Sequence, residues 1–346
     1  MRIRAVGLCS SVGLDAPSAC AAIRARISRF EESEFVDAGG APIVAAMAPE
    51  AVGDRHGYRR LAPLVIEAIR DCLAAGASVL QGNRPRVPLL VALDGPDRPD
   101  YPADLTDRLT AELAPVLKGS PLRPPEFVVK GPLAYLHALR RAAGLLQDKS
   151  ADACIVATVD SLVNRRILRS LEEAQRLKTE DNPDGVIPGE AAACLLLERP
   201  SSADSPYPDI CGIGLVDEPS VKTSTPNLAV GLADAIRDAV RQSGLRFEEI
   251  AFRVGGMTGE QASFAEGSTS VARVQRVHKE DFELWVPAEK LGDVGAALPA
   301  CMLVITAVGI AKGYAPGQSA LLFWPSTSAE RGALVVRVPE RAARGR

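Results

Sequence analysis

The sequence is poor in the residues from which metal and disulfide sites are built. Its 346 residues include three histidines and an odd number of cysteines, seven. The cysteines lie far apart, with no C-x-x-C spacing, at positions 9, 20, 72, 154, 194, 211 and 301. A zinc site needs clustered Cys and His ligands, and a disulfide framework needs paired cysteines in an oxidising compartment. We therefore expect no metal, no disulfides and a reducing, cytoplasmic location.

Long apolar runs and an excess of basic residues are also missing. No stretch reaches the roughly 18 consecutive apolar residues that span a bilayer, and residues 1–15 lack the apolar core of a signal peptide. The formal net charge is -3, so the composition does not favour nucleic acid or an anionic membrane as a partner. No glycine-rich phosphate loop follows a strand, and we expect no cofactor. Residues 341–346 form a short basic tail, which we expect to be solvated.

What the sequence does contain is a regular alternation of apolar runs and helical patterns. Strands are expected at 3–12, 42–47, 87–93, 126–130, 153–159, 191–198, 210–216, 250–254, 282–286, 319–323 and 333–338. Helices are expected at 18–28, 58–75, 105–117, 133–147, 164–177, 228–242, 261–277 and 296–312. A Ser- and Pro-rich linker at 200–208 separates two halves, 1–200 and 209–340. Near-continuous apolar strands, such as 153–157, alternate with helices and predict an α/β protein with a parallel or mixed sheet covered on both faces.

Two segments of the first half carry a resemblance to a known family. Residues 151–162 form an apolar run that ends in a turn, and residues 179–192 contain an Asp-Gly-x-x-x-Gly-Glu loop before another apolar run. Their order and spacing resemble the N-terminal half of the β-ketoacyl synthases, and residues 5–14 and 287–297 resemble other parts of that family. The resemblance implies a thiolase-like fold of five αβαβα layers, built from two duplicated βαβαβαββ-like halves.

The resemblance also implies three catalytic positions, and this sequence departs from the family at each of them. The family uses a thiol nucleophile at the start of a buried helix, where the helix dipole favours a thiolate, and two His, or a His and an Asn. The nucleophile position falls at Gly131 and Pro132, the first His at Gly255 and Gly256, and the second at Asp293. We therefore expect a degenerate, non-catalytic site at these five residues.

Other candidate groups have simpler structural explanations. The histidines lie before a helix, one turn inside a helix and in a charged stretch, at His56, His137 and His278. Cys9 is expected to be a small core residue, and Glu190 to shape its loop. Lys130, beside the degenerate site, is a weak candidate for binding an acyl or phosphopantetheine anion.

A fold kept without its reactive groups is typical of a binding protein. Stand-alone thiolase-like proteins without the nucleophile resemble accessory proteins of bacterial type VI secretion gene clusters. The main expectation is therefore an adaptor or co-chaperone whose partner is an effector or chaperone. Two alternatives stay open: a ketosynthase partner subunit of chain-length-factor type, and an acyl-thioester enzyme with altered chemistry. The second alternative requires Asp293 and His137 to lie in one cleft.

The family's geometry also predicts contacts. Asp293 and the loop 255–259 should lie near Pro132, where the helix dipole is expected to lower the pKa of Asp293. The strand at 126–130, with Pro124 and Pro125 marking its start, should pair antiparallel with its copy across a two-fold axis. This predicts a homodimer whose interface contains Phe127, Val128 and Val129. Burial of these residues within one chain, or capture of the edge by a different protein, are the alternatives.

Overall fold

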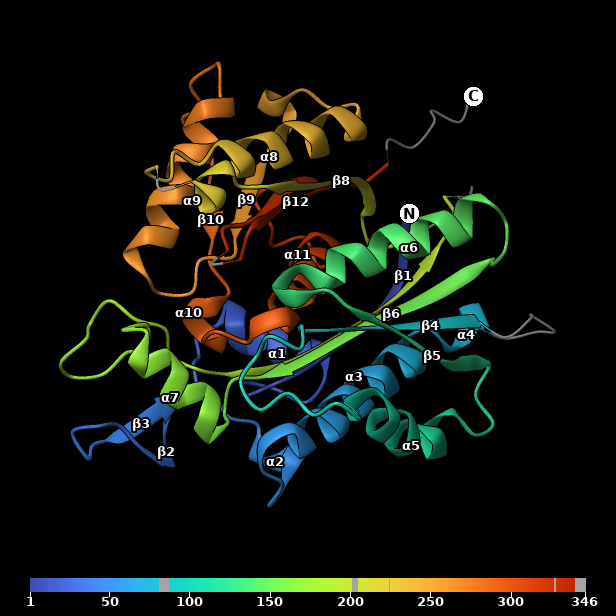
Figure 1. Ribbon diagram of the computed structural model, residues 1–346. Helices are drawn as coiled ribbons and strands as arrows, with labels where there is room; N and C mark the ends of the chain where they lie inside the picture. The colour runs from blue at the N-terminus through green and yellow to red at the C-terminus, as the bar shows by residue number, and fades with distance from the viewer. Residues whose placement is uncertain (81–86, 201–204, 224, 327, 340–346) are drawn as a thin grey trace, which may run out of the picture.

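Ten strands form one mixed sheet that consists of two five-stranded units (Figure 1). The computed structural model describes residues 1–339 apart from 81–86, 201–204, 224 and 327. The first unit contains β1 (Arg2–Ser10), β4 (Val87–Leu93), β5 (Leu122–Val129), β6 (Ala153–Ser161) and β7 (Glu190–Glu198). The second contains β8 (Asp209–Asp217), β9 (Phe252–Gly255), β10 (Leu284–Trp285), β11 (Ser319–Trp324) and β12 (Glu330–Arg337). The basic tail expected at 341–346 and part of the expected linker lie outside the described residues.

Both units have the same strand order. Counted outward from the line where the units meet, each runs first, fifth, fourth, second and third strand. The first strands, β1 and β8, meet at a single bridge between Arg2 and Asp209, whose side chains also form an ion pair of 3.0 Å. The repeated order is the duplicated architecture that the resemblance implied. The exact division at 200 and 209 stays a prediction.

Three layers of helices alternate with the two five-stranded units of the sheet, so the molecule has five layers in all (Figure 1). The outer helices of the first unit are α3 (Leu61–Ala75) and α5 (Leu105–Leu117), and those of the second are α8 (Val230–Ser243) and α9 (Gln261–Val274). The central layer holds α1 (Ala16–Arg24), α6 (Ala134–Gln147) and α11 (Leu298–Ala311). Smaller elements are α2 (Pro49–Val52), α4 (Ala77–Leu80), α7 (Arg165–Glu173), α10 (Ala288–Leu291) and a separate hairpin of β2 (Glu31–Val36) and β3 (Pro42–Ala45).

The sequence of β6 explains why this strand can lie between two helical layers. Successive side chains of a strand point to opposite faces of the sheet. Ile155 and Ala157 pack with the outer helices, whereas Cys154 and Val156 pack with the central layer. A strand buried on both faces is therefore mostly apolar, as the run at 153–159 is apart from Thr158.

Glycine lets a helix approach the first strand of each unit closely. A Cβ added to Gly7 on β1 would lie 2.0 Å from the carbonyl oxygen of Ala68 on α3. A Cβ added to Gly214 on β8 would lie 1.9 Å from the carbonyl oxygen of Ala235 on α8. The two units thus repeat the same glycine–alanine contact, although their sequences are otherwise dissimilar.

Several elements differ from their predicted extents. The helix predicted at 164–177 ends at Glu173, and the strand Glu31–Val36 was not predicted because its side chains are mostly charged and exposed. β5 begins at Leu122, so Pro124 and Pro125 lie inside it rather than at its start. Proline lacks an N–H and is tolerated within a strand only at the edge of a sheet. β5 is the edge strand, which gives the physical reason for this difference.

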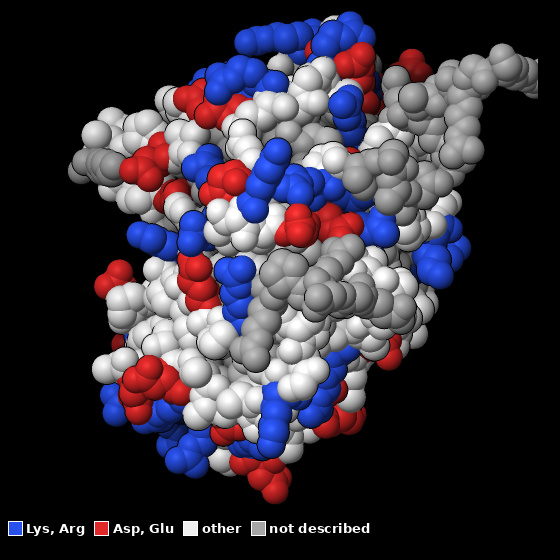
Figure 2. Space-filling model, turned by 90° about the vertical axis from the view of Figure 1, so that its right-hand side faces the viewer, with Lys and Arg blue, Asp and Glu red and all other residues white. Residues whose placement is uncertain are grey.

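Within the described ranges, no helix is both long and apolar enough to cross a bilayer, and no group of three His, Cys, Asp or Glu residues is arranged to hold a metal ion. Figure 2 shows Lys and Arg interspersed with Asp and Glu over one face. That face offers no continuous basic surface of the kind that binds nucleic acid.

Glu190 anchors the loop that carried the resemblance. Its carboxylate is fully buried and accepts hydrogen bonds from Arg60 (2.6 and 2.7 Å), the Ala48 backbone N–H (2.8 Å) and the Ser161 hydroxyl (2.9 Å). Because both of its oxygens accept hydrogen bonds, the Glu190 side chain fixes the loop to Arg60, which directly precedes α3, and to Ser161 of β6. This is the structural role expected for Glu190.

Removing the partner of this buried carboxylate should strongly destabilise the protein. We expect Arg60→Met to lower the free energy of unfolding by about 3–5 kcal/mol, because it leaves a charge buried without compensation. The matched control is Arg70→Met, which breaks the exposed ion pair with Glu67 and should cost about 1 kcal/mol or less. Urea unfolding followed by circular dichroism measures both. Equal effects of the two substitutions would contradict the anchoring role.

Candidate functional site

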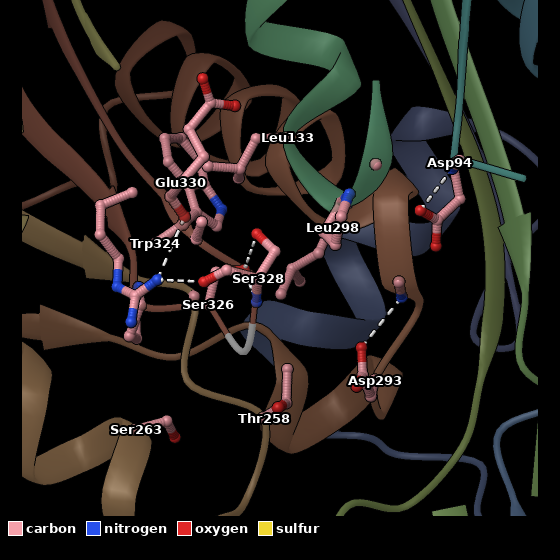
Figure 3. Close-up of a pocket in the computed structure, with 18 of the residues that line it drawn as sticks. Asp94, Leu133, Thr258, Ser263, Asp293, Leu298, Trp324, Ser326, Ser328 and Glu330 are labelled. Atoms are coloured by element: carbon pink, nitrogen blue, oxygen red, sulfur yellow. Dashed lines mark hydrogen bonds between the residues drawn. The ribbon is translucent and has the colours of Figure 1, made fainter. Parts of the chain in front are cut away.

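A cavity of about 1110 Å³ lies beyond the carboxyl ends of parallel strands from both units. In the first unit, the loops after β4 and β5 contribute Asp94 and Lys130 to its wall. In the second, the segments after β9 and β11 contribute Thr258 and Ser326. Ligand sites of α/β proteins are usually found at this position. The cavity is therefore the candidate site, and Figure 3 shows part of its wall.

The start of α6 forms one side of the cavity. Gly131 and Pro132 follow β5 in a tight 3-10 turn, in which Gly131 has a φ of +75° that favours glycine. Pro132 has neither a nucleophilic side chain nor a backbone N–H, and the neighbouring Gly131 and Leu133 also carry no nucleophilic side chain. Leu133, which is 3% exposed, also lines the cavity. No histidine or cysteine is found among the described residues of the wall.

The position expected for the first histidine is filled by other side chains. Gly256 lines the cavity, and a Cβ added to it would lie 2.2 Å from Cδ1 of the Trp324 indole. Gly255 is not part of the wall, and a Cβ added to it would lie 2.4 Å from Cε of Met257. Trp324 and Met257 are each 2% exposed. The indole thus leaves no room for a histidine at 256.

Asp293 lies in the same wall as Gly131, Pro132 and Gly256. Its Oδ1 accepts a hydrogen bond from the Gly295 N–H (2.9 Å) (Figure 3). The pKa of Asp293 is raised, because its desolvation on burial outweighs this hydrogen bond and the more distant charges of Arg176 and Arg98. The prediction that the helix dipole lowers this pKa was therefore wrong in direction.

Asp94 and Arg98 line the cavity and form a cluster with Asp160, which is not itself part of the wall. Arg98 pairs with Asp94 (Nε to Oδ2, 2.9 Å) and with Asp160. Asp160 also accepts the backbone N–H of Ala296 at the start of α11 (2.7 Å). Burial raises the pKa of Asp94 to about 6, with Arg98 opposing the rise and Asp160 adding to it.

The sequence analysis did not identify this cluster. Asp94 and Asp160 both lie where a predicted strand ends, and the ends of neighbouring parallel strands meet at one edge of a sheet. That signal could have singled out the two acids. Gly295 adds a further requirement, because its φ is +52° and a Cβ there would lie 2.1 Å from Oδ2 of Asp160.

Two further ion pairs in the wall join separate parts of the chain. Arg176, from the segment after α7, makes two hydrogen bonds of 2.7 Å with Glu260 at the start of α9. Arg331 of β12 pairs with Glu266 of α9, which also accepts a hydrogen bond from Asn227 (2.9 Å). Each arginine is thereby neutralised by a carboxylate of another element.

The other candidates from the sequence lie outside the cavity wall. His56 is exposed and pairs with Glu34, and His278 is exposed. His137 forms a hydrogen bond of 2.8 Å with Glu330 and does not line the cavity. The alternative of an enzyme with altered chemistry would require His137 to lie in the cavity beside Asp293. Cys9 is fully buried, and this burial raises the pKa of its thiol to about 12.

The residues expected at a dimer interface lie on the edge strand β5. Phe127 and Val129 pack partly against the outer layer of the first unit, and Val128 packs partly against the central layer. All three remain half-buried. Their role in a dimer interface stays a prediction.

Comparison with solved structures identifies the fold. The ishigamide ketosynthase/chain length factor matches with a TM-score of 0.71 and 18% identity, over 98% of this chain and 99% of that chain. AntDE:AntF, a type II PKS acyl-carrier protein in complex with its ketosynthase, matches with a TM-score of 0.80 and 14% identity, over 98% of each chain. The ketosynthase ApeO in complex with its chain length factor ApeC, from Xenorhabdus doucetiae, matches with a TM-score of 0.75 and 15% identity, over 97% of each chain.

Sequence comparison gives no corresponding result. Neither a protein-family model nor a curated protein matches the sequence. The structural likeness extends over nearly the whole chain. Because the sequence identities are below 20%, this likeness establishes the fold alone. The protein therefore has the thiolase-like fold that these ketosynthase structures share.

Proposed function

We propose that this protein is a non-catalytic partner subunit of a ketosynthase, of the chain-length-factor type. The observation that carries the proposal is the turn at Gly131 and Pro132, which offers no nucleophilic side chain at the start of α6. Acyl transfer to an enzyme needs an activated nucleophile with a base in reach, and the described wall of the cavity contains no Cys or His. A subunit of this kind would act by assembling with an active ketosynthase.

The edge of the sheet supports assembly with another protein. Within the described residues, β5 is bonded to β4 on one side and to no strand on the other. An open edge presents unpaired backbone groups that can pair with a strand of another chain. Solved structures with this fold include ketosynthases in complex with chain length factors. We infer that β5 is the edge through which this chain pairs with a ketosynthase.

The type VI secretion adaptor that the sequence suggested has less support. Five of the solved structures that match are ketosynthases, some with a chain length factor or a carrier protein, and none of these five is described as an effector adaptor. The ketosynthase partner, first an alternative, is therefore our preferred function. An effector or chaperone remains a prediction to be judged by the binding experiment below.

The protein should not accept an acyl group. After incubation with an acyl-CoA, we expect its intact mass to be unchanged, because the start of α6 has no thiol and the thiol of Cys9 is buried with a raised pKa. An active ketosynthase is the positive control. A stoichiometric acyl adduct that disappears in Cys9→Ala, or in any other single Cys→Ala variant, would overturn the non-catalytic proposal.

Placing a charge on β5 should lower the affinity of this protein for the ketosynthase. In Val128→Lys, an ammonium replaces a half-buried apolar side chain at the pairing edge, which we expect to weaken the complex at least about tenfold. The control is Val36→Lys on β2, where Val36 is 61% exposed. Co-purification with the ketosynthase of the source organism, followed by light scattering, measures complex formation. Thermal unfolding establishes that both variants are folded.

Three outcomes of this experiment would count against the proposal. A complex that survives Val128→Lys as well as it survives Val36→Lys would exclude β5 as the interface. A stable dimer mass for the chain alone would favour the homodimer predicted from the sequence. Selective binding of a secretion effector instead of the ketosynthase would favour the adaptor function.

A further inference from the structure

Asp293 is a carboxylate of the cavity wall that forms no ion pair among the described residues. Its carboxylate accepts one hydrogen bond within the protein, from the Gly295 N–H, and its backbone N–H and C=O are bonded to Ile187 and Gly189. The three arginines of the wall are already held by other carboxylates: Arg98, Arg176 and Arg331. Asp293 is therefore the carboxylate with which a ligand can pair.

The rim does not reverse this charge. Lys130 and Asp97 both line the cavity and are both exposed to solvent, so their opposite charges are screened and offset each other. In the cavity wall, Arg98 pairs with Asp94 and also with Asp160, so two carboxylates share one guanidinium. The interior next to Asp293 thus carries a net negative charge, which repels an anionic ligand and attracts a cationic one.

A second, independent feature of the wall also points to a ligand. The indole N–H of Trp324 is buried and has no hydrogen-bond partner among the described residues. Trp324 is 2% exposed, and its Nε1 lies beside Gly256, which lines the same cavity. A buried donor without an acceptor is costly, so a ligand that brings an acceptor to Trp324 would gain from this contact.

The surface between these groups is apolar. Leu133 and Leu298 are 3% and 4% exposed, and both line the cavity with Pro132. In Figure 3, these two leucines lie between Trp324 on one side and Asp94 and Asp293 on the other. An aliphatic chain is the part of a ligand that such a surface accommodates.

We propose that this cavity binds a small aliphatic molecule that carries a protonated amine and a neutral hydrogen-bond acceptor. The ammonium group pairs with Asp293, the aliphatic part lies against Leu133 and Leu298, and the acceptor takes the indole N–H of Trp324. The same charges exclude ligands with a carboxylate head. This assignment does not rest on the proposed function, because it concerns the isolated chain.

Three probes of matched length test the proposal on the full-length protein by isothermal titration calorimetry. They are 6-amino-1-hexanol, 6-hydroxyhexanoate, in which a carboxylate replaces the ammonium, and hexylamine, which lacks the acceptor. We expect 6-amino-1-hexanol to bind at least about tenfold more tightly than 6-hydroxyhexanoate, the effect of one charge-assisted hydrogen bond. Hexylamine should bind with intermediate affinity. Equal or tighter binding of 6-hydroxyhexanoate, or no binding of 6-amino-1-hexanol at millimolar concentration, would overturn the proposal.

Two isosteric variants locate the binding site. Asp293→Asn keeps an oxygen for the Gly295 N–H and should weaken 6-amino-1-hexanol at least about tenfold. Asp97→Asn, the matched control on the rim, should leave its affinity within about twofold, because exposed charges contribute little. Equal affinities of wild type and Asp293→Asn would refute the pairing. If Asp293→Asn fails to fold, the probe series on the wild type still decides the proposal.

Tryptophan fluorescence provides an independent readout. The chain contains two tryptophans, of which Trp324 lines the cavity and Trp285 does not. Binding of 6-amino-1-hexanol should change the emission of the wild type, and this change should be lost in Trp324→Phe while calorimetric binding persists in weakened form. An emission change that survives Trp324→Phe would place the ligand elsewhere.

Discussion

The contact between the carboxylate of Asp160 and the backbone before α11 is the interaction on which the rest of the site depends. Asp160 lies near the end of β6 in the first unit, where its carboxylate binds the guanidinium of Arg98 and accepts the N–H of Ala296, two residues before α11 in the second unit. Through this contact, the loop that carries Asp293 is held against the carboxyl ends of the first unit's strands. The cavity is consequently formed by both units together.

Sequence patterns were informative about the fold because its strands are buried on both faces. A run such as 153–159 is apolar apart from Thr158, and the helices that cover it repeat their apolar residues at helical spacing. By contrast, β2 contains three glutamates. Its residues form neither an apolar run nor an apolar–polar alternation, so its sequence does not predict a strand. The repeat of the two units was visible as a similar order of elements. Its physical trace in the residues is confined to contacts such as Gly7 with Ala68 and Gly214 with Ala235.

The site was less accessible from sequence than the fold. The residues taken from the family pattern, among them Pro132, Gly256 and Asp293, do line one cavity. What fills the space around them depends on contacts between distant segments, such as Trp324 against Gly256. The pKa of Asp293 also could not be inferred, because desolvation by the surrounding chain outweighs the hydrogen bond from Gly295 and the charges of Arg176 and Arg98. Local sequence carries no information about either effect.

The two prolines within β5 have a consequence for the length of strand that can add to this edge. Neither Pro124 nor Pro125 has an N–H, so continuous donors on the edge are confined to residues 126–129. At about 3.4 Å per residue, this segment is roughly 14 Å long. Such a segment can pair with one short strand of another protein, but it cannot template the extended, repetitive pairing that leads to fibrils. Pro124 and Pro125 therefore protect this edge from aggregation while residues 126–129 can still pair with a partner strand.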